Sequence, residues 1–118
     1  MPSLLTSSKE VLRRLKYYLP WTTHEEKFRF AEVSHGRLYR SAKPTPISLT
    51  YFFRQYNLRS LVVLTRNNSQ LEETIRELNL KILNLPLNTG SPPNKDDVDK
   101  FLDFVNEPNN QPSLVFCA

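Results

Sequence analysis

The sequence lacks several features that would define a class of protein at once. It has a single cysteine, Cys117, so no disulfide can form within the chain, and we expect a reducing, cytoplasmic environment. No apolar run approaches the roughly 18 residues that a membrane span needs, and Leu4–Leu5 is too short for the core of a signal peptide. The sequence has no internal repeat and no low-complexity segment. With 118 residues, of which 24% are charged, the chain is expected to form one small globular domain without a transmembrane segment.

Positive charge is concentrated in the N-terminal third of the chain. Residues 1–43 contain nine lysines and arginines and four acidic residues, whereas residues 44–118 contain seven and eight. A basic patch of this kind can attract phosphate, nucleic acid or an anionic membrane surface, although a solvated helix face has the same charge pattern. The sequence shows neither clustered aromatic residues nor a groove-reading helix signature, so we do not expect a nucleic-acid partner.

The spacing of apolar residues predicts an amphipathic helix over residues 7–19. Ser7 and Glu10 have the spacing of a capping box, and Pro20 ends the helix. The helix belongs to a basic N-terminal segment, residues 1–27, that includes a linker. It is a candidate for peripheral contact with a membrane surface, and docking on the rest of the protein is the alternative.

From residue 28 onward, short strands alternate with helices. Strands are expected over residues 28–33, 37–39, 60–65, 81–87 and 113–117, and helices over residues 47–56, from residue 69 onward and over residues 94–106. The continuous apolar run of residues 60–65 predicts a strand that is buried on both faces. Strand–helix alternation predicts an α/β fold with a mostly parallel sheet flanked by helices.

Each expected helix has a recognisable start. A hydroxyl and a proline, Thr45 and Pro46, open the first helix. Ser69 has capping-box spacing in the second helix, and Asn94 caps the third. In the third helix, the positions i, i+3, i+4 and i+7 form an apolar stripe made of Val98, Phe101, Leu102 and Val105.

Cys117 is the clearest candidate for a chemically reactive residue. It stands at the carboxyl end of the last expected strand, and ligand crevices of parallel sheets lie beyond that end of the strands. Cysteine reacts as the thiolate, which backbone N–H groups of a following helix can stabilise. A single cysteine at a strand end is also compatible with an inert structural role.

Three segments occur in an order that resembles a known enzyme family. They are residues 36–46 (GRLYRSAKPTP), 56–64 (YNLRSLVVL) and 111–117 (QPSLVFC). They resemble the cysteine-dependent protein tyrosine and dual-specificity phosphatases, in particular the small bacterial-type group. The resemblance implies a phosphatase-like α/β domain over residues 28–118, incomplete at the C-terminus. It also implies that phosphate monoesters are hydrolysed through a cysteinyl-phosphate intermediate on Cys117.

This sequence departs from the family in two ways at the signature loop. In the family, N–H groups after the cysteine and an arginine hold the phosphate, but this sequence ends one residue after Cys117. We therefore expect the 118-residue chain to be inactive by itself. Phe116 stands where the family usually has a histidine that supports the loop and the thiolate.

Several residues are candidates for the general acid and for phosphate binding. The family's general acid is an aspartate on a loop that would follow the strand ending near residue 87, and the first carboxylates after that point are Asp96 and Asp97. Both also suit the first turn of a helix, where the helix dipole favours negative charge. Arg40 and Arg66, each following an expected strand, are candidates for phosphate binding. The histidines lack metal-ligand spacing, so no metal and no other cofactor is expected.

Other functions remain open beside the phosphatase. The resemblance implies a phosphorylated protein or a small phosphate ester as partner, without selecting between them. A non-catalytic phosphatase-like interaction module would instead use the basic N-terminal face to bind a partner. A rhodanese-like sulfur carrier also places a cysteine after a parallel strand, but the Tyr39-Arg40-Ser41 segment argues against it.

Overall fold

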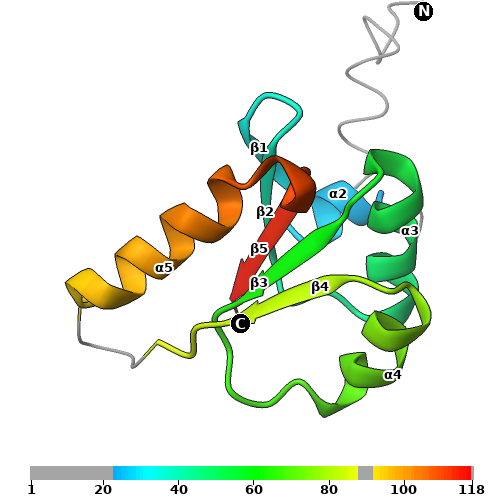
Figure 1. Ribbon diagram of the computed structural model, residues 1–118. Helices are drawn as coiled ribbons and strands as arrows, with labels where there is room; N and C mark the ends of the chain where they lie inside the picture. The colour runs from blue at the N-terminus through cyan, green and yellow to red at the C-terminus, as the bar shows by residue number, and fades with distance from the viewer. Residues whose placement is uncertain (1–22, 88–91, 118) are drawn as a thin grey trace, which may run out of the picture.

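The computed structural model consists of one sheet with helices on both faces, and it describes residues 23–87 and 92–117 (Figure 1). The helix expected over residues 7–19 lies outside the described residues. The elements in chain order are α2 (His24–Lys27), β1 (Ala31–Ser34), β2 (Leu38–Ala42), α3 (Pro46–Tyr56), β3 (Ser60–Val63), α4 (Ser69–Glu77), β4 (Lys81–Asn84), α5 (Lys95–Asn106), the 3₁₀ turn η1 (Pro108–Asn110) and β5 (Ser113–Cys117). None of the helices in this described part combines the length and apolar character that crossing a bilayer would need.

The sheet has the strand order β1-β2-β5-β3-β4, which places β5 at its centre. β1 and β2 form an antiparallel hairpin, and the pairs β2–β5, β5–β3 and β3–β4 are parallel. Parallel neighbours need long crossover connections, and α3, α4 and α5 provide them. The expected mostly parallel α/β fold is therefore confirmed.

β5 has the bounds that the sequence pattern indicated, and the other four strands differ from theirs. β1 begins at Ala31 instead of residue 28, because Phe28 forms the C-cap of α2, and β2 continues to Ala42. β3 and β4 end at Val63 and Asn84, since the apolar residues beyond them belong to the loops at the carboxyl end of the sheet. All four residues of β3 are buried, as the apolar run predicted.

Two of the three predicted helix starts are confirmed and one is wrong. The Thr45 hydroxyl accepts a hydrogen bond from the Ser48 N–H at 3.2 Å, and the Asn94 side chain accepts one from the Asp97 N–H at 2.8 Å. The N-cap of α4 is Asn68 instead of Ser69. Its side chain caps no helical N–H because it bonds to the hydroxyl and the carbonyl oxygen of Thr65, which closes the preceding turn instead.

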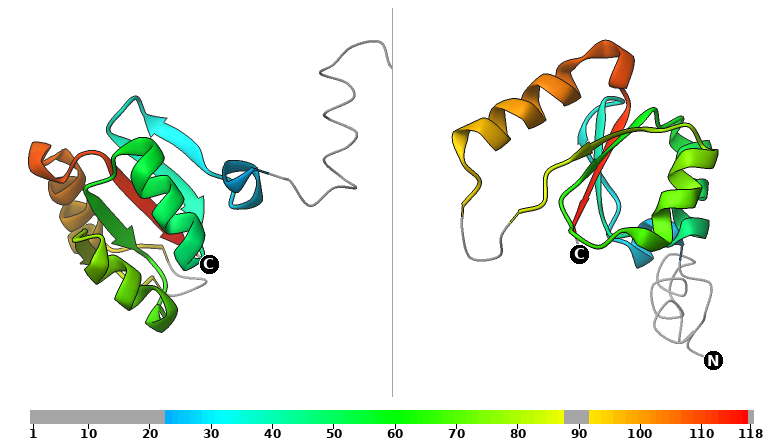
Figure 2. Two further views of the ribbon diagram at one scale, coloured as in Figure 1. Left: turned by 90° about the vertical axis from the view of Figure 1, so that its right-hand side faces the viewer. Right: turned by 60° about the horizontal axis from the view of Figure 1, so that its bottom comes forward.

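Each face of the sheet buries a hydrophobic cluster, and the two clusters differ in size. The larger one lies on the side of α3 and α4 and includes Leu49, Phe52, Leu114 and Phe116. The smaller one lies on the side of α5, the opposite face in Figure 2, and has Val105 at its centre. The apolar stripe of α5 is only partly inward, because Val98 is 41% and Leu102 46% exposed while Phe101 and Phe104 pack on the cluster.

Candidate active site at the carboxyl end of the central strand

Cys117 is the last residue of β5, at the carboxyl end of the central strand. The parallel register places Ala42, the end of β2, beside it. On the other side, the Leu64 N–H donates to the Phe116 carbonyl oxygen at 3.1 Å, which extends the β3–β5 pairing past the end of β3. The Cys117 side chain is exposed. The thiol therefore lies where three parallel strands end together, the region in which ligands of such sheets bind.

A cavity of about 350 Å³ surrounds this strand end. Its polar and charged lining residues are Arg29, Arg40, Ser41 and Cys117, and none of the residues that line it is acidic. The buried Ser41 hydroxyl donates to the Ala42 carbonyl oxygen at 2.8 Å, so it is already engaged within the backbone of the cavity wall. Two arginines thus line the same space as Cys117, and their positive charge favours an anionic ligand there.

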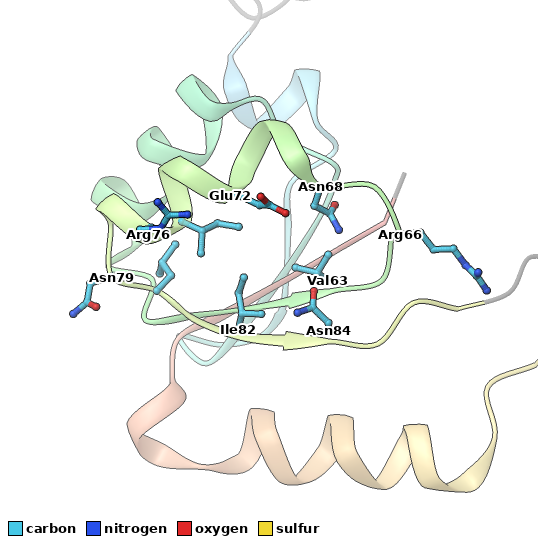
Figure 3. A pocket seen from close by; sticks show the side chains of 10 residues that line it. Val63, Arg66, Asn68, Glu72, Arg76, Asn79, Ile82 and Asn84 are labelled. Atoms are coloured by element: carbon cyan, nitrogen blue, oxygen red, sulfur yellow. The ribbon is translucent and has the colours of Figure 1, made fainter.

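Arg40 and Arg66, the two candidates for phosphate binding, occupy different places. Arg40 lies within β2 instead of following a strand, and it lines the cavity of Cys117. Arg66 follows β3 and lines another cavity, of about 510 Å³, between α4 and β4. Figure 3 shows its side chain pointing away from the rest of that lining. The structure therefore brings Arg40, and not Arg66, to the cysteine.

Arg29 also lines the Cys117 cavity, and no pattern in the sequence indicates this role. It adopts a left-handed backbone conformation with φ 53° directly after α2. The Ala42 N–H donates to the Phe28 carbonyl oxygen at 2.7 Å, which ties this turn to the end of β2. The contact joins segments on either side of the β1–β2 hairpin, and no sequence periodicity reports such a contact.

The two aspartates proposed as general acids lie in the first turn of α5. Asp96 is exposed. Asp97 is half-buried and lines an apolar cavity of about 210 Å³. Leu64 and Val115 line both this cavity and that of Cys117, so the two spaces adjoin. Neither aspartate lines the Cys117 cavity itself.

Phe116 packs as a core residue. It is 1% exposed and belongs to the large cluster between the sheet and α3 and α4. Its neighbours there are apolar side chains such as Leu61 and Val63. The position at which the resemblance implies a histidine therefore contributes to packing in this chain.

A tyrosine–carboxylate cluster anchors α2 beside this site. The Glu25 carboxylate accepts hydrogen bonds from the hydroxyls of Tyr51, at 2.5 Å, and Tyr56, at 3.1 Å. Burial raises the pKa of Glu25, but the bonds from Tyr51, its own backbone and Tyr56 together hold it below its usual value. Burial and then the bond to Glu25 raise the pKa of Tyr56 to about 12.

These features define a phosphatase-type α/β domain with a cysteine at the end of its central strand. The family model described as "DSP-PTPase phosphatase fused to NAD+ Kinase" matches residues 14–118. The chain belongs to this family of dual-specificity and tyrosine phosphatase-type proteins, which confirms the resemblance seen in the sequence.

Several solved structures share the fold. The PP-IP phosphatase SIW14 from S. cerevisiae has a TM-score of 0.67 and 23% identity, over 75% of this chain and 55% of that one. TpbA from P. aeruginosa has a TM-score of 0.64 and 18% identity, over 78% and 55%. A putative phosphatase from Shewanella putrefaciens CN-32 has a TM-score of 0.63 and 14% identity, over 75% of this chain and 57% of that one. The chain thus spans a little over half the length of these structures. No curated protein matches its sequence.

Proposed function

We propose that this chain is part of a phosphatase that hydrolyses phosphate monoesters with Cys117 as nucleophile. One observation carries the proposal: in a chain of this family, an exposed thiol and the Arg40 guanidinium line one cavity at the carboxyl end of the central strand. A phosphate ester in that cavity would meet a nucleophile and a cation from two neighbouring strands. Arg40 can form two parallel hydrogen bonds to phosphate oxygens.

The proposed reaction has two steps. The Cys117 sulfur forms a bond to phosphorus while the bond from phosphorus to the leaving oxygen breaks, and that oxygen takes up a proton. Water then attacks phosphorus, the sulfur–phosphorus bond breaks, and inorganic phosphate and the thiolate are released. N–H and guanidinium donors that face the phosphoryl oxygens lower both barriers. The family's phosphate loop follows the cysteine, so we propose that the 118 residues need that loop for turnover.

For the general acid we propose Asp97 over Asp96. Asp97 lines the apolar cavity that shares Leu64 and Val115 with the Cys117 cavity, whereas Asp96 is exposed at the outer side of the same helical turn. A general acid must reach the leaving oxygen, and Asp97 lines the space that adjoins the Cys117 cavity.

We propose a phosphorylated protein or a small phosphate ester as the substrate. SIW14 is described as a PP-IP phosphatase, and TpbA has been solved in complex with pTyr, which supports a small phosphate compound and a phosphorylated tyrosine side chain as the two candidates. We also propose that residues 28–118 form the phosphatase-like domain, preceded by a basic N-terminal segment, and that the protein works in the cytoplasm. The single cysteine supports this location.

Hydrolysis of p-nitrophenyl phosphate by the full-length protein that contains this chain tests the proposal. We expect turnover that Cys117→Ser abolishes, together with transient transfer of labelled phosphate to the wild-type protein. The matched control is Ser34→Ala, an exposed serine of β1 outside the cavity, which should leave turnover unchanged. Turnover that survives Cys117→Ser overturns the mechanism, and an inert wild-type protein favours the interaction module.

A further inference from the structure

β4 is an edge strand of the sheet, and within the described residues one side of it has no partner strand. It pairs only with β3, which separates it from β5. The N–H groups of Lys81 and Leu85 donate to carbonyl oxygens on the β3 side, at 3.2 and 2.9 Å. Because successive residues of a strand direct their backbone groups to opposite sides, Ile82 and Asn84 present N–H and C=O groups at the open edge. An edge of this kind can pair with a strand from another chain.

A cavity of about 510 Å³ lies along this open edge, between β4 and α4. Ile75 and Leu80 are buried in its lining, and Ile82 of β4 also lines it and is 37% exposed. Figure 3 shows Glu72 and Arg76 on the helix side of the cavity and Ile82 on the strand side. An exposed apolar side chain and unpaired backbone groups thus share one surface.

The flank of α4 beside this edge carries one acidic and one basic residue, four positions apart. Glu72 and Arg76 are both exposed and both line the cavity. Within the part of the chain that the structure describes, no ion pair joins either of them to another residue. α4 ends shortly before β4 begins, so Arg76 lies toward the amino end of β4 and Glu72 toward its carboxyl end. A second copy, turned by 180° about an axis perpendicular to the sheet, presents these two charges in the reverse order.

We infer that this chain binds a second copy of itself through the edge of β4, so that the two sheets continue into one another and the two α4 helices pack side by side. Such a contact is isologous, because each copy gives and receives the same interactions. The inference does not depend on the proposed function, since β3 lies between this edge and the strand that carries Cys117.

The alternation along β4 favours a register in which Ile82 lies opposite Ile82 of the second copy. Directly opposite residues of an antiparallel pair have their side chains on the same face, and in a hydrogen-bonded pair they exchange both backbone bonds. The two Ile82 residues exchange these bonds and pack their side chains together, and the Asn84 N–H donates to the Leu80 carbonyl oxygen of the second copy. Lys81, a residue type that discourages edge pairing, lies opposite Leu83 and meets no like charge.

The spacing of strands and helices fits this arrangement. α4 connects β3 to β4 and packs on their common face, where Ile75 and Val63 belong to one cluster and line the cavity together with Ile82. Neighbouring strands are about 4.8 Å apart, so two helices that each lie over the last two strands of their own sheet are separated by about 10 Å. This is the distance at which helices pack. Glu72 of each copy then lies beside Arg76 of the other.

Charge reversal tests this contact in the full-length protein. We expect light scattering after size-exclusion chromatography to give the mass of a dimer for the wild-type protein. Glu72→Arg and Arg76→Glu each place like charges opposite one another and should raise the dissociation constant of the dimer at least tenfold. An equimolar mixture of the two variants should form a dimer again, because each copy supplies the charge that the other lacks. Glu73→Arg, at an exposed position of α4 outside the cavity, is the matched control and should remain dimeric.

Cross-linking tests the register. In a Cys117→Ser background, a short bismaleimide should join Ile82→Cys to its counterpart, whereas Ile47→Cys, at a 76% exposed position of α3, should not react in this way. A monomeric wild-type protein overturns the inference, and so does a dimer whose dissociation constant neither charge reversal changes. Variants that dissociate alone but do not associate on mixing, or a dimer that fails to cross-link selectively at Ile82, overturn the contact through β4.

Discussion

Ala42 lies directly beside Cys117 in the parallel register of β2 and β5, and both residues line the same cavity. The smallest side chain that still has a Cβ atom thus stands next to the thiol, and the space around the sulfur depends on it. A larger residue at this position would fill the cavity from the side of β2. The pair therefore offers a direct test of whether the cavity is the route to the thiol.

We expect Ala42→Leu to slow the alkylation of Cys117 by iodoacetamide several-fold while leaving the fold intact. The half-buried site tolerates the added volume at a cost of about 1 kcal/mol in the free energy of unfolding. The measurement is the rate of alkylation at fixed pH, followed by mass spectrometry. Ser34→Leu, at an exposed position of β1 outside the cavity, serves as control and should alkylate at the wild-type rate. Equal rates for both variants would mean that the thiol is reached by another route.

The histidine of the phosphatase family is expected to be unfavourable at position 116 of this chain. Phe116→His places an imidazole in the large apolar cluster, beside the cross-strand neighbour Ser41, whose hydroxyl already donates to the Ala42 carbonyl oxygen. We expect a loss of about 2 kcal/mol in the free energy of unfolding, measured by urea denaturation. Val33→His, at a residue that is 55% exposed, should cost nothing measurable. A Phe116→His variant as stable as the wild type would show that the core accommodates the family residue.

The tyrosine–carboxylate cluster around Glu25 should make the free energy of unfolding depend on pH at both ends of the pH scale. The pKa of Glu25 is lowered in the folded state, so its contribution is complete above the ordinary value of 4.5 and is lost as the pH falls below it. The pKa of Tyr56 is raised to about 12, so its contribution is complete below pH 10 and is lost as the pH rises from 10 to 12.

Two variants test these signs in urea denaturation at pH 3 to 11. Glu25→Gln should flatten the acid side of the profile and Tyr56→Phe the alkaline side, and Tyr56→Phe should cost about 1 to 2 kcal/mol at pH 7 because it removes a hydrogen bond to a charged group. Glu73→Gln, on the exposed face of α4, is the control for the loss of one carboxylate. An unchanged acid limb in Glu25→Gln would contradict the assignment.

The helix caps provide a further test. Asn94→Ala removes the bond from the Asn94 side chain to the Asp97 N–H and should cost about 1 kcal/mol in the free energy of unfolding. Ser69→Ala should cost less than about 0.5 kcal/mol, because Ser69 does not cap α4 and its hydroxyl bonds only to Asn67. A larger loss for Ser69→Ala than for Asn94→Ala would reverse the roles that the structure gives these two residues.

The sequence was a good guide wherever a single segment decides its own structure. The caps of α3 and α5 and the burial of β3 follow from residues that are neighbours in the chain, so they could be predicted. The cap of α4 could not, because the amide of Asn68 was already engaged by Thr65. The exposure of Val98 and Leu102 was also not predictable, since periodicity reports which residues share a helix face but not how much of that face the sheet covers.

The sequence by itself determined the elements, the mostly parallel sheet and the position of Cys117 at a strand end, since caps, apolar runs and proline positions act locally. Only the tertiary structure decided which cations accompany that thiol. It brought Arg29 and Arg40 to it, and it left Arg66 and Asp96 elsewhere. The physical reason is that strand register, the order of strands in the sheet and a left-handed turn after α2 depend on packing between segments far apart in the chain.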